Sequence, residues 1–393
     1  MTKAQEGYFL IADITGYTVY LHESELEHAQ ETLQALLELL INHTKPPLVI
    51  SRLAGDAVIS YALKDNFFGG QTFVEMIEDT YVAFRKAINL MVLNNTCHCK
   101  ACANVSALDL KFFVHYGSFA IQHLSEHDEL VGNDVNLIHR LLKNHVTERT
   151  GYRAYTLYTD AAIRQLGIKE ISLSMTRHVE IYEHLGDVHT WVQEMHAVWE
   201  AKKDESQIVI ADDDVMAFQE KEFSLSPVAM WDIVTNPEYR AIFVRSTRQN
   251  ILNRQDGRLA AGSIYQCFHG DKRITLQVIL DWRPFEQMTT EDTTPIPGAK
   301  CLINIKLIPM ETGTRLQFTS SKARGPWLSR VICNLLGPRA IRRMFREGLR
   351  ELKERLDQEM AAGQYEPVER QSMAPEEIEQ AAASSLNEVS DVE

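Results

Sequence analysis

Two acidic side chains and a small turn in the first half of the chain are suited to holding a charged phosphate ligand. Asp13 follows an apolar run that reads as a strand, and Asp56 stands in a Gly-Asp turn between two further strand-like runs. Hard divalent cations prefer carboxylate oxygens as ligands. Gly16, just after Asp13, lets backbone N–H groups approach a phosphate closely. We therefore predict a cation and polyphosphate site where these strands end.

A third stretch adds an amide and a guanidinium group. Asn136 and Arg140 are four residues apart in a predicted helix, 133–144, so they lie on one helical face. An arginine brings fixed positive charge to a transferring phosphoryl group, and an asparagine can orient a sugar. Taken singly, each feature has a plainer explanation, namely a capped turn, a hairpin turn or a solvated helix face. Together they favour a metal–nucleotide site.

The cysteines allow a second kind of chemistry. Cys97, His98, Cys99 and Cys102 form the densest group of soft ligands in the chain, and they could bind Zn²⁺ or another thiophilic ion. However, Cys97 and Cys99 are closer than in an ordinary two-residue knuckle, and no second Cys-x-x-Cys pair completes the set. A loop with free thiols, or a redox switch, remains an alternative for this group.

Strands and helices must alternate to place the first-half residues. Apolar β-rich runs predict strands at 8–12, 48–51, 57–61 and 110–115, the last ended by Tyr116-Gly117. Helical periodicity predicts helices at 24–42, 73–93 and 133–144. Five apolar residues share one stripe of the first helix: Leu33, Leu36, Leu37, Leu40 and Ile41. This alternation predicts an α/β or α+β sandwich with helices on one side of a sheet, and we take α+β as the fold class.

The second half has a different pattern, which predicts further domains. A polar stretch marks a linker at 201–214, between one domain at 1–200 and another at 215–362. A strand at 216–223 precedes a helix that begins at Ser226-Pro227. Glycine-punctuated strands such as 274–280 and 301–308 follow, and then a long helix, 327–360, bent at Gly337-Pro338. Residues 363–393 hold eight acids and one base and predict a disordered tail.

Composition limits the possible functions. The chain has 393 residues, 45% of them hydrophobic, which is enough for two domains with separate cores. Its net charge of −14 disfavours sequence-independent binding to nucleic acid or to anionic membranes. No apolar run is long enough for a membrane span, and the start does not read as a secretory signal. Six cysteines do not make a disulfide framework. We expect a cytoplasmic protein with reduced thiols.

Residues 6–195 resemble the catalytic core of the class III nucleotide cyclases, the adenylyl and guanylyl cyclases, in a divergent bacterial branch. The motifs that carry the resemblance are Phe9–Thr18, Arg52–Asp56 and Val131–Arg140. The 43-residue separation of the two aspartates and the sequence His115-Tyr-Gly fit the same pattern. The resemblance implies a ferredoxin-like sheet with helices. It also implies an active site at the two-fold interface of a homodimer, an assembly that the sequence does not settle.

The resemblance also implies roles for individual residues. Asp13, Asp56 and the carbonyl of Ile14 would hold Mg²⁺, or Mn²⁺ or Ca²⁺, against ATP. The remaining implied roles are phosphate binding by the turn Thr15, Gly16, Tyr17 and Thr18, purine recognition by Arg52 and Glu129, ribose positioning by Asn136, and transition-state stabilisation by Arg140.

Two departures from the family pattern bear on activity. Arg52 and Glu129 keep the charge signs of the family's Lys/Asp pair but not its side-chain shapes. The late lysine that binds the triphosphate is missing from Tyr182–Gly186, where His184 is a weak substitute. Losing one such cation lowers the rate a hundredfold or more. We therefore expect ATP and metal binding with an incomplete catalytic set. The alternative is an active adenylyl cyclase that converts ATP to cyclic AMP and pyrophosphate.

Residues 214–362 resemble the START-like (SRPBCC, helix-grip) superfamily. The resemblance is carried by Phe223–Trp231, Asn236–Tyr239, Asp281–Phe285 and the long helix from Trp327. It implies a curved sheet around the terminal helix, with a cavity for a small apolar ligand and a regulatory role. The aromatic residues in these segments are also explained by simple packing in the core of the domain. A basic stripe is expected to face solvent or the neighbouring domain: Arg339, Arg342, Arg343, Arg346 and Arg350. A third hypothesis is a lipid or metabolite binder whose first half only dimerises.

Overall fold

The computed structural model describes residues 4–22, 26–64, 69–93, 104–124, 127–183, 185–203, 207–270 and 273–363. These residues form two compact units, 4–203 and 207–363, and each unit has its own sheet. The α+β class is as predicted. The thiol group around Cys97, Cys99 and Cys102, the substitute His184 and the acidic tail from 364 onward lie outside the described residues.

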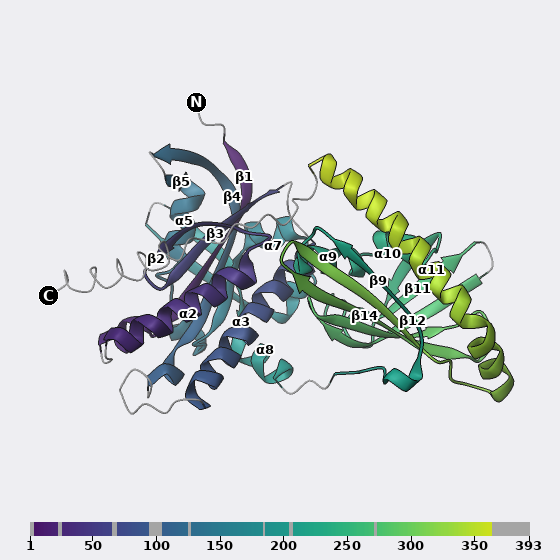
Figure 1. Ribbon diagram of the computed structural model, residues 1–393. Coiled ribbons are helices and arrows are strands. Elements are labelled where there is room, and N and C mark those ends of the chain that lie inside the picture. The colour runs from purple at the N-terminus through teal and green to yellow at the C-terminus, as the bar shows by residue number, and fades with distance from the viewer. Residues whose placement is uncertain are drawn as a thin grey trace. The chain divides into compact units, whose positions relative to one another are not determined.

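The sheet of the first unit is centred on β1 (Figure 1). Its strands run in the order β2-β3-β1-β4-β6-β8-β7, and β5 pairs with the end of β4. All neighbours are antiparallel except β4 and β6. The bounds are β1 Gln5–Thr15, β2 Val49–Ala54, β3 Ala57–Leu63, β4 Asp109–Leu124, β5 His127–Val131, β6 Tyr155–Thr159, β7 Thr176–Tyr182 and β8 Gly186–Glu194.

Helices cover both faces of this sheet rather than the single face we expected. Tyr8 contacts Phe73 of α3, whereas Phe9 packs with Val135 and Ile138 of α5. Because successive strand residues point to opposite faces, α3 and α5 lie on opposite sides. The helical elements are α1 Tyr17–His22, α2 Leu26–Thr44, α3 Gly70–Leu93, α5 Asn133–Leu141, α6 Val146–Thr150, α7 Asp160–Leu166, α8 Met195–Lys202, and the 3-10 turns η2 Val105–Ala107 and η3 Ile171–Ser174.

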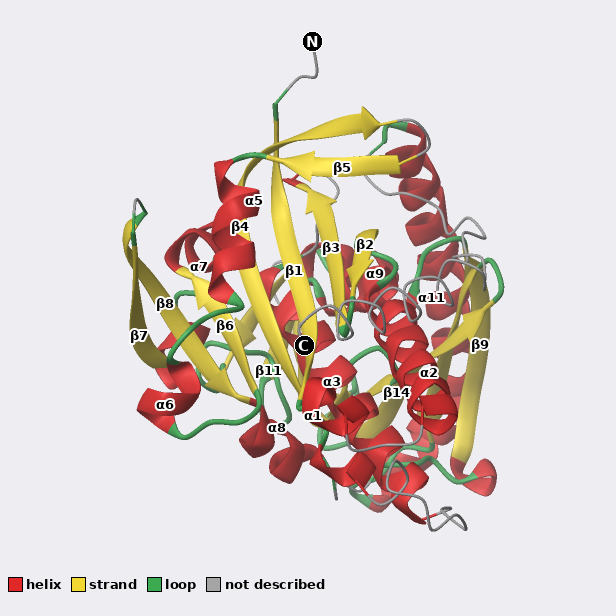
Figure 2. Cartoon of the chain, turned by 90° about the vertical axis from the view of Figure 1, so that its left-hand side faces the viewer, coloured by secondary structure: helices red, strands yellow, loops and turns green. Residues whose placement is uncertain are grey.

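The predicted apolar stripe of α2 is confirmed, because all five of its residues are buried. The predicted end of β4 is wrong. The strand continues through Tyr116, which pairs with Tyr8, and Gly117, which pairs with Gly7. Figure 2 shows β5 against the far part of β4, beyond the start of β1. A Cβ atom at residue 117 would overlap the carboxylate of Asp134, so this glycine permits a close approach and does not form a turn.

The sheet of the second unit is antiparallel throughout. Its order is β10-β11-β12-β13-β14-β15-β9, so the first strand along the chain, β9, pairs with the last, β15, and lies at the opposite edge from β10. The bounds are β9 Val215–Phe223, β10 Arg248–Leu252, β11 Ile264–His269, β12 Arg273–Arg283, β13 Gln287–Thr293, β14 Lys300–Met310, β15 Gly313–Ser321, η4 Asp212–Asp214, α9 Pro227–Thr235, α10 Pro237–Phe243 and α11 Trp327–Ala361.

The predicted helix start at Ser226-Pro227 and the predicted long terminal helix are confirmed, and the bend at Gly337-Pro338 stays a prediction. The hydroxyl of Ser226 accepts a hydrogen bond from the N–H of Ala229, and Pro227 occupies the first turn of α9. The terminal helix α11 is continuous through Pro338. Its later half is buried at Phe345, Leu349, Leu352 and Leu356. None of the helices in the described residues combines the length and the apolar character that crossing a membrane requires.

Candidate functional site

Asp13 and Asp56 stand at neighbouring strand ends, as predicted. Asp13 pairs with Ala57, the first residue of β3, and the N–H of Ile14 donates a hydrogen bond of 3.1 Å to the carbonyl of Asp56. Burial, and then the negative charge of Asp13, raises the pKa of Asp56 to about 7. Burial also raises the pKa of Asp13. The two carboxyl groups therefore interact, and both are shielded from solvent.

A lysine that sequence reasoning missed lies beside this carboxylate pair. Lys111 of β4 is the strand partner of Asp13, on the opposite edge of β1 from β3. Burial lowers the pKa of Lys111, and the charges of Asp13 and Asp109 oppose that shift. Its ammonium nitrogen is 5.2 Å from the centre of the Tyr155 ring. A positive group thus already faces Asp13, so a cation bound there must share or displace it.

The turn after Asp13 has the backbone form needed for a close approach. Gly16 has φ +88°, a conformation that side-chain-bearing residues rarely adopt. The hydroxyl of Thr15 is buried, with no hydrogen-bond partner in the described part of the chain. The side chain of Tyr17 is also buried, and α1 begins at that residue. Tyr17 and Thr18 could therefore serve a phosphate through backbone N–H groups, as the predicted role requires.

Arg52 and Glu129 are brought together, as predicted for a purine-recognising pair. The guanidinium nitrogen of Arg52 lies 3.6 Å from a carboxylate oxygen of Glu129, and both side chains are about half exposed. A second guanidinium nitrogen is 3.5 Å from Nε2 of His139 on α5. Burial, and then the charge of Arg52, lowers the pKa of His139. Arg52 and Glu129 already contact each other, so a purine that binds here must replace some of these contacts.

Asn136 and Arg140 lie on the exposed face of α5, opposite the buried Val135, Ile138 and Leu141. Among the described residues, no contact or charge interaction joins them to Asp13 or Asp56. The charge of Arg140 instead acts on the phenol of Tyr182. In a single chain the two halves of the predicted catalytic set are therefore separate.

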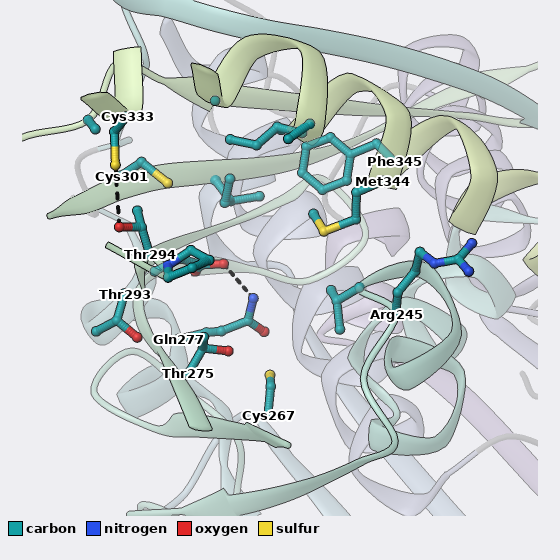
Figure 3. A pocket seen from close by; sticks show the side chains of 18 of the residues that line it. Arg245, Cys267, Thr275, Gln277, Thr293, Thr294, Cys301, Cys333, Met344 and Phe345 are labelled. Atoms are coloured by element: carbon teal, nitrogen blue, oxygen red, sulfur yellow. Dashed lines mark hydrogen bonds between the residues drawn. The ribbon is translucent and has the colours of Figure 1, made fainter. Parts of the chain in front are cut away.

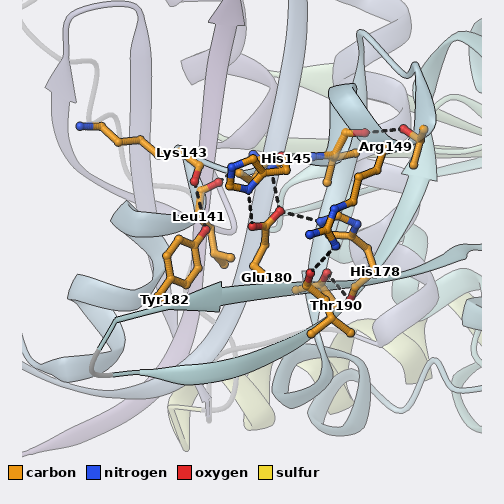
Figure 4. Close-up of polar contacts among 12 residues, drawn as sticks. Leu141, Lys143, His145, Arg149, His178, Glu180, Tyr182 and Thr190 are labelled. Carbon is orange, nitrogen blue, oxygen red and sulfur yellow. Dashed lines mark hydrogen bonds and ion pairs between the residues drawn. The ribbon is translucent and has the colours of Figure 1, made fainter.

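A buried glutamate anchors the strand next to α5 and α6 (Figure 4). Glu180 accepts hydrogen bonds of 2.6 Å from the backbone N–H of His145 and of 2.6 Å from Nε2 of His178. Its other oxygen is 2.9 Å from Nδ1 of His145. Burial alone would raise the pKa of Glu180, but these hydrogen bonds outweigh it and lower the pKa. This cluster holds β7 in place, next to the Tyr182–Gly186 turn.

The residues present fit a divalent cation that is completed by a phosphate ligand. Asp13 and Asp56 supply carboxylates, and the predicted set adds the carbonyl of Ile14. Within the described residues no group of three or more His, Cys, Asp or Glu side chains could hold a metal by itself. Mg²⁺ commonly binds one or two carboxylates plus substrate phosphates and water. Phosphate oxygens would therefore have to complete the coordination.

The second unit contains a cavity of about 430 Å³, lined by strands of its sheet and by α11. Figure 3 shows Met344 and Phe345 of α11 on one side of it, and Cys267, Thr275 and Gln277 of the sheet on the other. The lining is mostly apolar, and the volume lies in the range of small-molecule sites. Burial raises the pKa of Cys267 to about 11, so its thiol is un-ionised at neutral pH.

A chain of buried polar side chains forms part of the cavity wall. Arg240 is 1% exposed, and it donates hydrogen bonds to the carbonyl of Val234 (3.0 Å) and to Gln277 (2.8 Å). The amide of Gln277 in turn donates to Asp292. Burial raises the pKa of Asp292 to about 6. The Nε atom of Arg240 is buried without a partner among the described residues, which leaves one unused donor.

Comparisons with known proteins match parts of the chain. Residues 33–151 match a family model described as "Protein of unknown function (DUF2652)". The chain is also 29% identical, over 160 residues, to "Uncharacterized protein Rv2561/Rv2562" of Mycobacterium tuberculosis. That alignment covers 39% of this chain and 69% of the mycobacterial protein.

Solved structures similar to part of the chain include adenylyl cyclases. A bacterial light-regulated adenylyl cyclase matches with 11% identity and a TM-score of 0.37, covering 51% of this chain; the chain spans 57% of that cyclase's length. The adenylyl cyclase CyaB from P. aeruginosa matches with 15% identity and a TM-score of 0.35, covering 49% of this chain and 95% of its own.

Proposed function

We propose that the first unit binds ATP together with a divalent cation, Mg²⁺ or in its place Mn²⁺ or Ca²⁺. The observation that carries this proposal is the position of Asp13 and Asp56 at adjacent strand ends, where the charge of Asp13 helps to raise the pKa of Asp56. A divalent cation between them relieves that repulsion. The Gly16 turn supplies backbone N–H groups beside the same place, and Lys111 supplies positive charge.

Isothermal titration of the full chain tests this proposal. ATP should bind in the presence of Mg²⁺ and much more weakly in EDTA. Both Asp13→Ala and the closer mimic Asp13→Asn should weaken binding tenfold or more, while Asp187→Asn, an exposed acid on β8, should leave it unchanged. Absence of binding at millimolar ATP, or binding unchanged in both Asp13 variants, would contradict the proposal.

The alternative is an active adenylyl cyclase. Asn136 and Arg140 are exposed on α5, so in a homodimer they could reach a nucleotide held by the aspartates of the other copy. Their separation from Asp13 within one chain is what favours this arrangement if turnover occurs. Formation of cyclic AMP from ATP with Mn²⁺, lost in Asp56→Ala and in Arg140→Ala, would favour the cyclase. ATP binding without cyclic AMP would leave the binding function alone.

We further propose that the second unit is a START-like domain that binds a small apolar molecule. The cavity of about 430 Å³ supports this, since most of its lining is apolar. The unused donor of Arg240 indicates that the ligand carries one hydrogen-bond-accepting group on an otherwise apolar body. A ligand of this kind would satisfy a buried group that the protein leaves unpaired.

Native mass spectrometry of the purified full chain tests the ligand site. We expect added mass from a co-purified apolar molecule, and its loss in Met344→Trp, which fills the cavity from α11. Glu354→Gln, an exposed change on the same helix, should retain the ligand. The ligand site would be contradicted if the wild-type protein had the mass of the polypeptide alone and took up no added fatty acid.

A regulatory role would couple the two units. If the apolar ligand changes ATP affinity, ATP must change affinity for that ligand by the same factor. Titrating ATP into ligand-loaded and ligand-free chain measures that factor directly. Equal ATP affinities would remove the regulatory role and leave two independent binding sites.

A further inference from the structure

The first three turns of α11 expose a continuous apolar face. Trp327 is 71% exposed, Leu335 73% and Leu336 64%. Their exposed neighbours on the helix complete the face, which we call the α11 patch: Trp327, Leu328, Val331, Ile332, Leu335 and Leu336. With 3.6 residues per turn, these spacings place all six on one side. Single exposed apolar residues need no explanation, but a contiguous group of this size marks a binding surface.

Positive charge surrounds the patch. Between residues 322 and 350 there are eight basic side chains and one acid, Glu347. Helical spacing puts the arginines at 339, 342, 343, 346 and 350 on the same side as the patch, further along the helix, and all five are exposed. Arg330, Arg339 and Arg346 have no ion-pair partner within the part of the chain that the structure describes. Much of this charge is therefore available to a partner.

The patch is continuous with the wall of the cavity in the second unit. Leu336 belongs to the patch and also lines the cavity, and Gly337, Ala340 and Ile341 continue the lining along the same helix. An apolar molecule could therefore move between the cavity and a hydrophobic phase at the patch without crossing water. The cavity and the exposed surface are thus parts of one apolar path.

We propose that the α11 patch docks the protein on an anionic lipid bilayer. A bilayer offers hydrocarbon for the apolar side chains and negative head groups for the arginines, and a tryptophan is favoured at that boundary. The net charge of −14 disfavours such binding only if the charge is spread evenly. Here one surface has an excess of basic side chains, even though Glu347 pairs with Arg343 and Glu354 with Arg350.

Two other occupants match the surface less well. A second copy of the chain would bring an identical run of arginines to the interface, and like charges oppose that contact. The acidic residues 364–393 could neutralise the arginines, but this stretch has few large apolar residues with which to cover the patch. A lipid surface can bind the apolar α11 patch and the arginines beside it at the same time.

Vesicle flotation of the full chain, without nucleotide, tests this proposal independently of the proposed function. We expect binding to phosphatidylcholine vesicles that contain phosphatidylglycerol, weakened by salt, and weak binding to phosphatidylcholine alone. The double change Trp327→Ser and Leu335→Ser should weaken binding tenfold or more. Both side chains are exposed, so the fold should survive, and thermal unfolding checks this. Leu173→Ser, an equally exposed leucine on η3, should bind as wild type.

The contribution of the arginines is tested with the double change Arg339→Gln and Arg346→Gln. These changes should remove the preference for anionic vesicles and leave the weak binding to neutral vesicles unchanged. Wild-type chain that floats with neither vesicle overturns the proposal. So does a chain that binds only after residues 364–393 are removed, which would assign the patch to that segment. A dimer that the double change converts to monomer, with no effect on vesicle binding, would assign it to self-association.

Discussion

Replacing Asp56 with asparagine should make the ligand-free protein more stable at neutral and alkaline pH. The folded-state pKa of Asp56 is about 7, against an ordinary value of 3.8. Because the folded pKa is raised, ionising this carboxyl weakens folding: the associated stability is complete below pH 3.8 and is lost as pH rises to about 7. The asparagine has no proton to lose, so Asp56→Asn avoids that loss.

The magnitude follows from the pKa difference. A shift of about 3 units corresponds to about 4 kcal/mol at 1.36 kcal/mol per unit. Partial solvent contact of the carboxyl reduces this, and we expect a gain of about 2 kcal/mol for Asp56→Asn over wild type at pH 8. Near pH 4 most of the gain should vanish, because the wild-type carboxyl is then protonated in the folded protein and, at its ordinary pKa of 3.8, about 40% protonated in the unfolded chain.

Urea unfolding in EDTA from pH 4 to 8, for wild type and Asp56→Asn, measures the difference. Asp292 also has a raised pKa, but it is present in both proteins and cancels. Asp187→Asn serves as the control and should follow wild type. Added Mg²⁺ should then stabilise wild type and not Asp56→Asn, since only the former keeps both carboxylates. A difference that is flat across this pH range would refute the raised pKa of Asp56, which burial and then the charge of Asp13 cause.

Three further changes test the second unit by unfolding. Gly348→Ala should destabilise it by about 1–3 kcal/mol, because a Cβ atom would overlap the backbone of Phe243, and a wild-type midpoint would contradict this packing. Ser226→Ala should cost about 1 kcal/mol by removing the cap on the N–H of Ala229, whereas Ser226→Thr should retain most of it. Asp292→Asn should gain about 2 kcal/mol relative to wild type between pH 4 and pH 6 and no more above it, with a constant difference counting against the raised pKa.

Local signals in the sequence account for the parts of the site that were predicted correctly. Asp13 and Asp56 each follow from a strand-like run next to a turn, and the cap at Ser226 follows from the proline after it. Such signals span only a few residues, so neighbouring side chains suffice to recognise them. The β2–β3 hairpin places Asp56 in its short turn, and the pairing of β1 with β3 then brings Asp13 beside it.

The parts that were missed depend on pairing between distant segments. Lys111 reaches Asp13 only because β4 pairs with β1 in one particular register, and a shift by one residue would move the lysine to the other face. In the sequence Gly117 suggests a turn. The structure gives another reason for the glycine, because the side chain of Asp134, from a later helix, occupies the space beside it. Arg240 of α10 likewise reaches Asp292 of β13 through Gln277 of β12, a link that depends on how α10 packs against the sheet.

Pro338 divides the terminal helix into two mechanically different parts. It has no N–H group, so the carbonyl of Asn334 lacks the helical hydrogen bond it would otherwise accept. On the far side of this break, the later turns are held by Phe345, Leu349 and Leu352, whereas most side chains of the first turns point into solvent. Amide hydrogens before Pro338 should therefore exchange with deuterium well before those after it, and the opening of the first turns should not require the later turns to unfold.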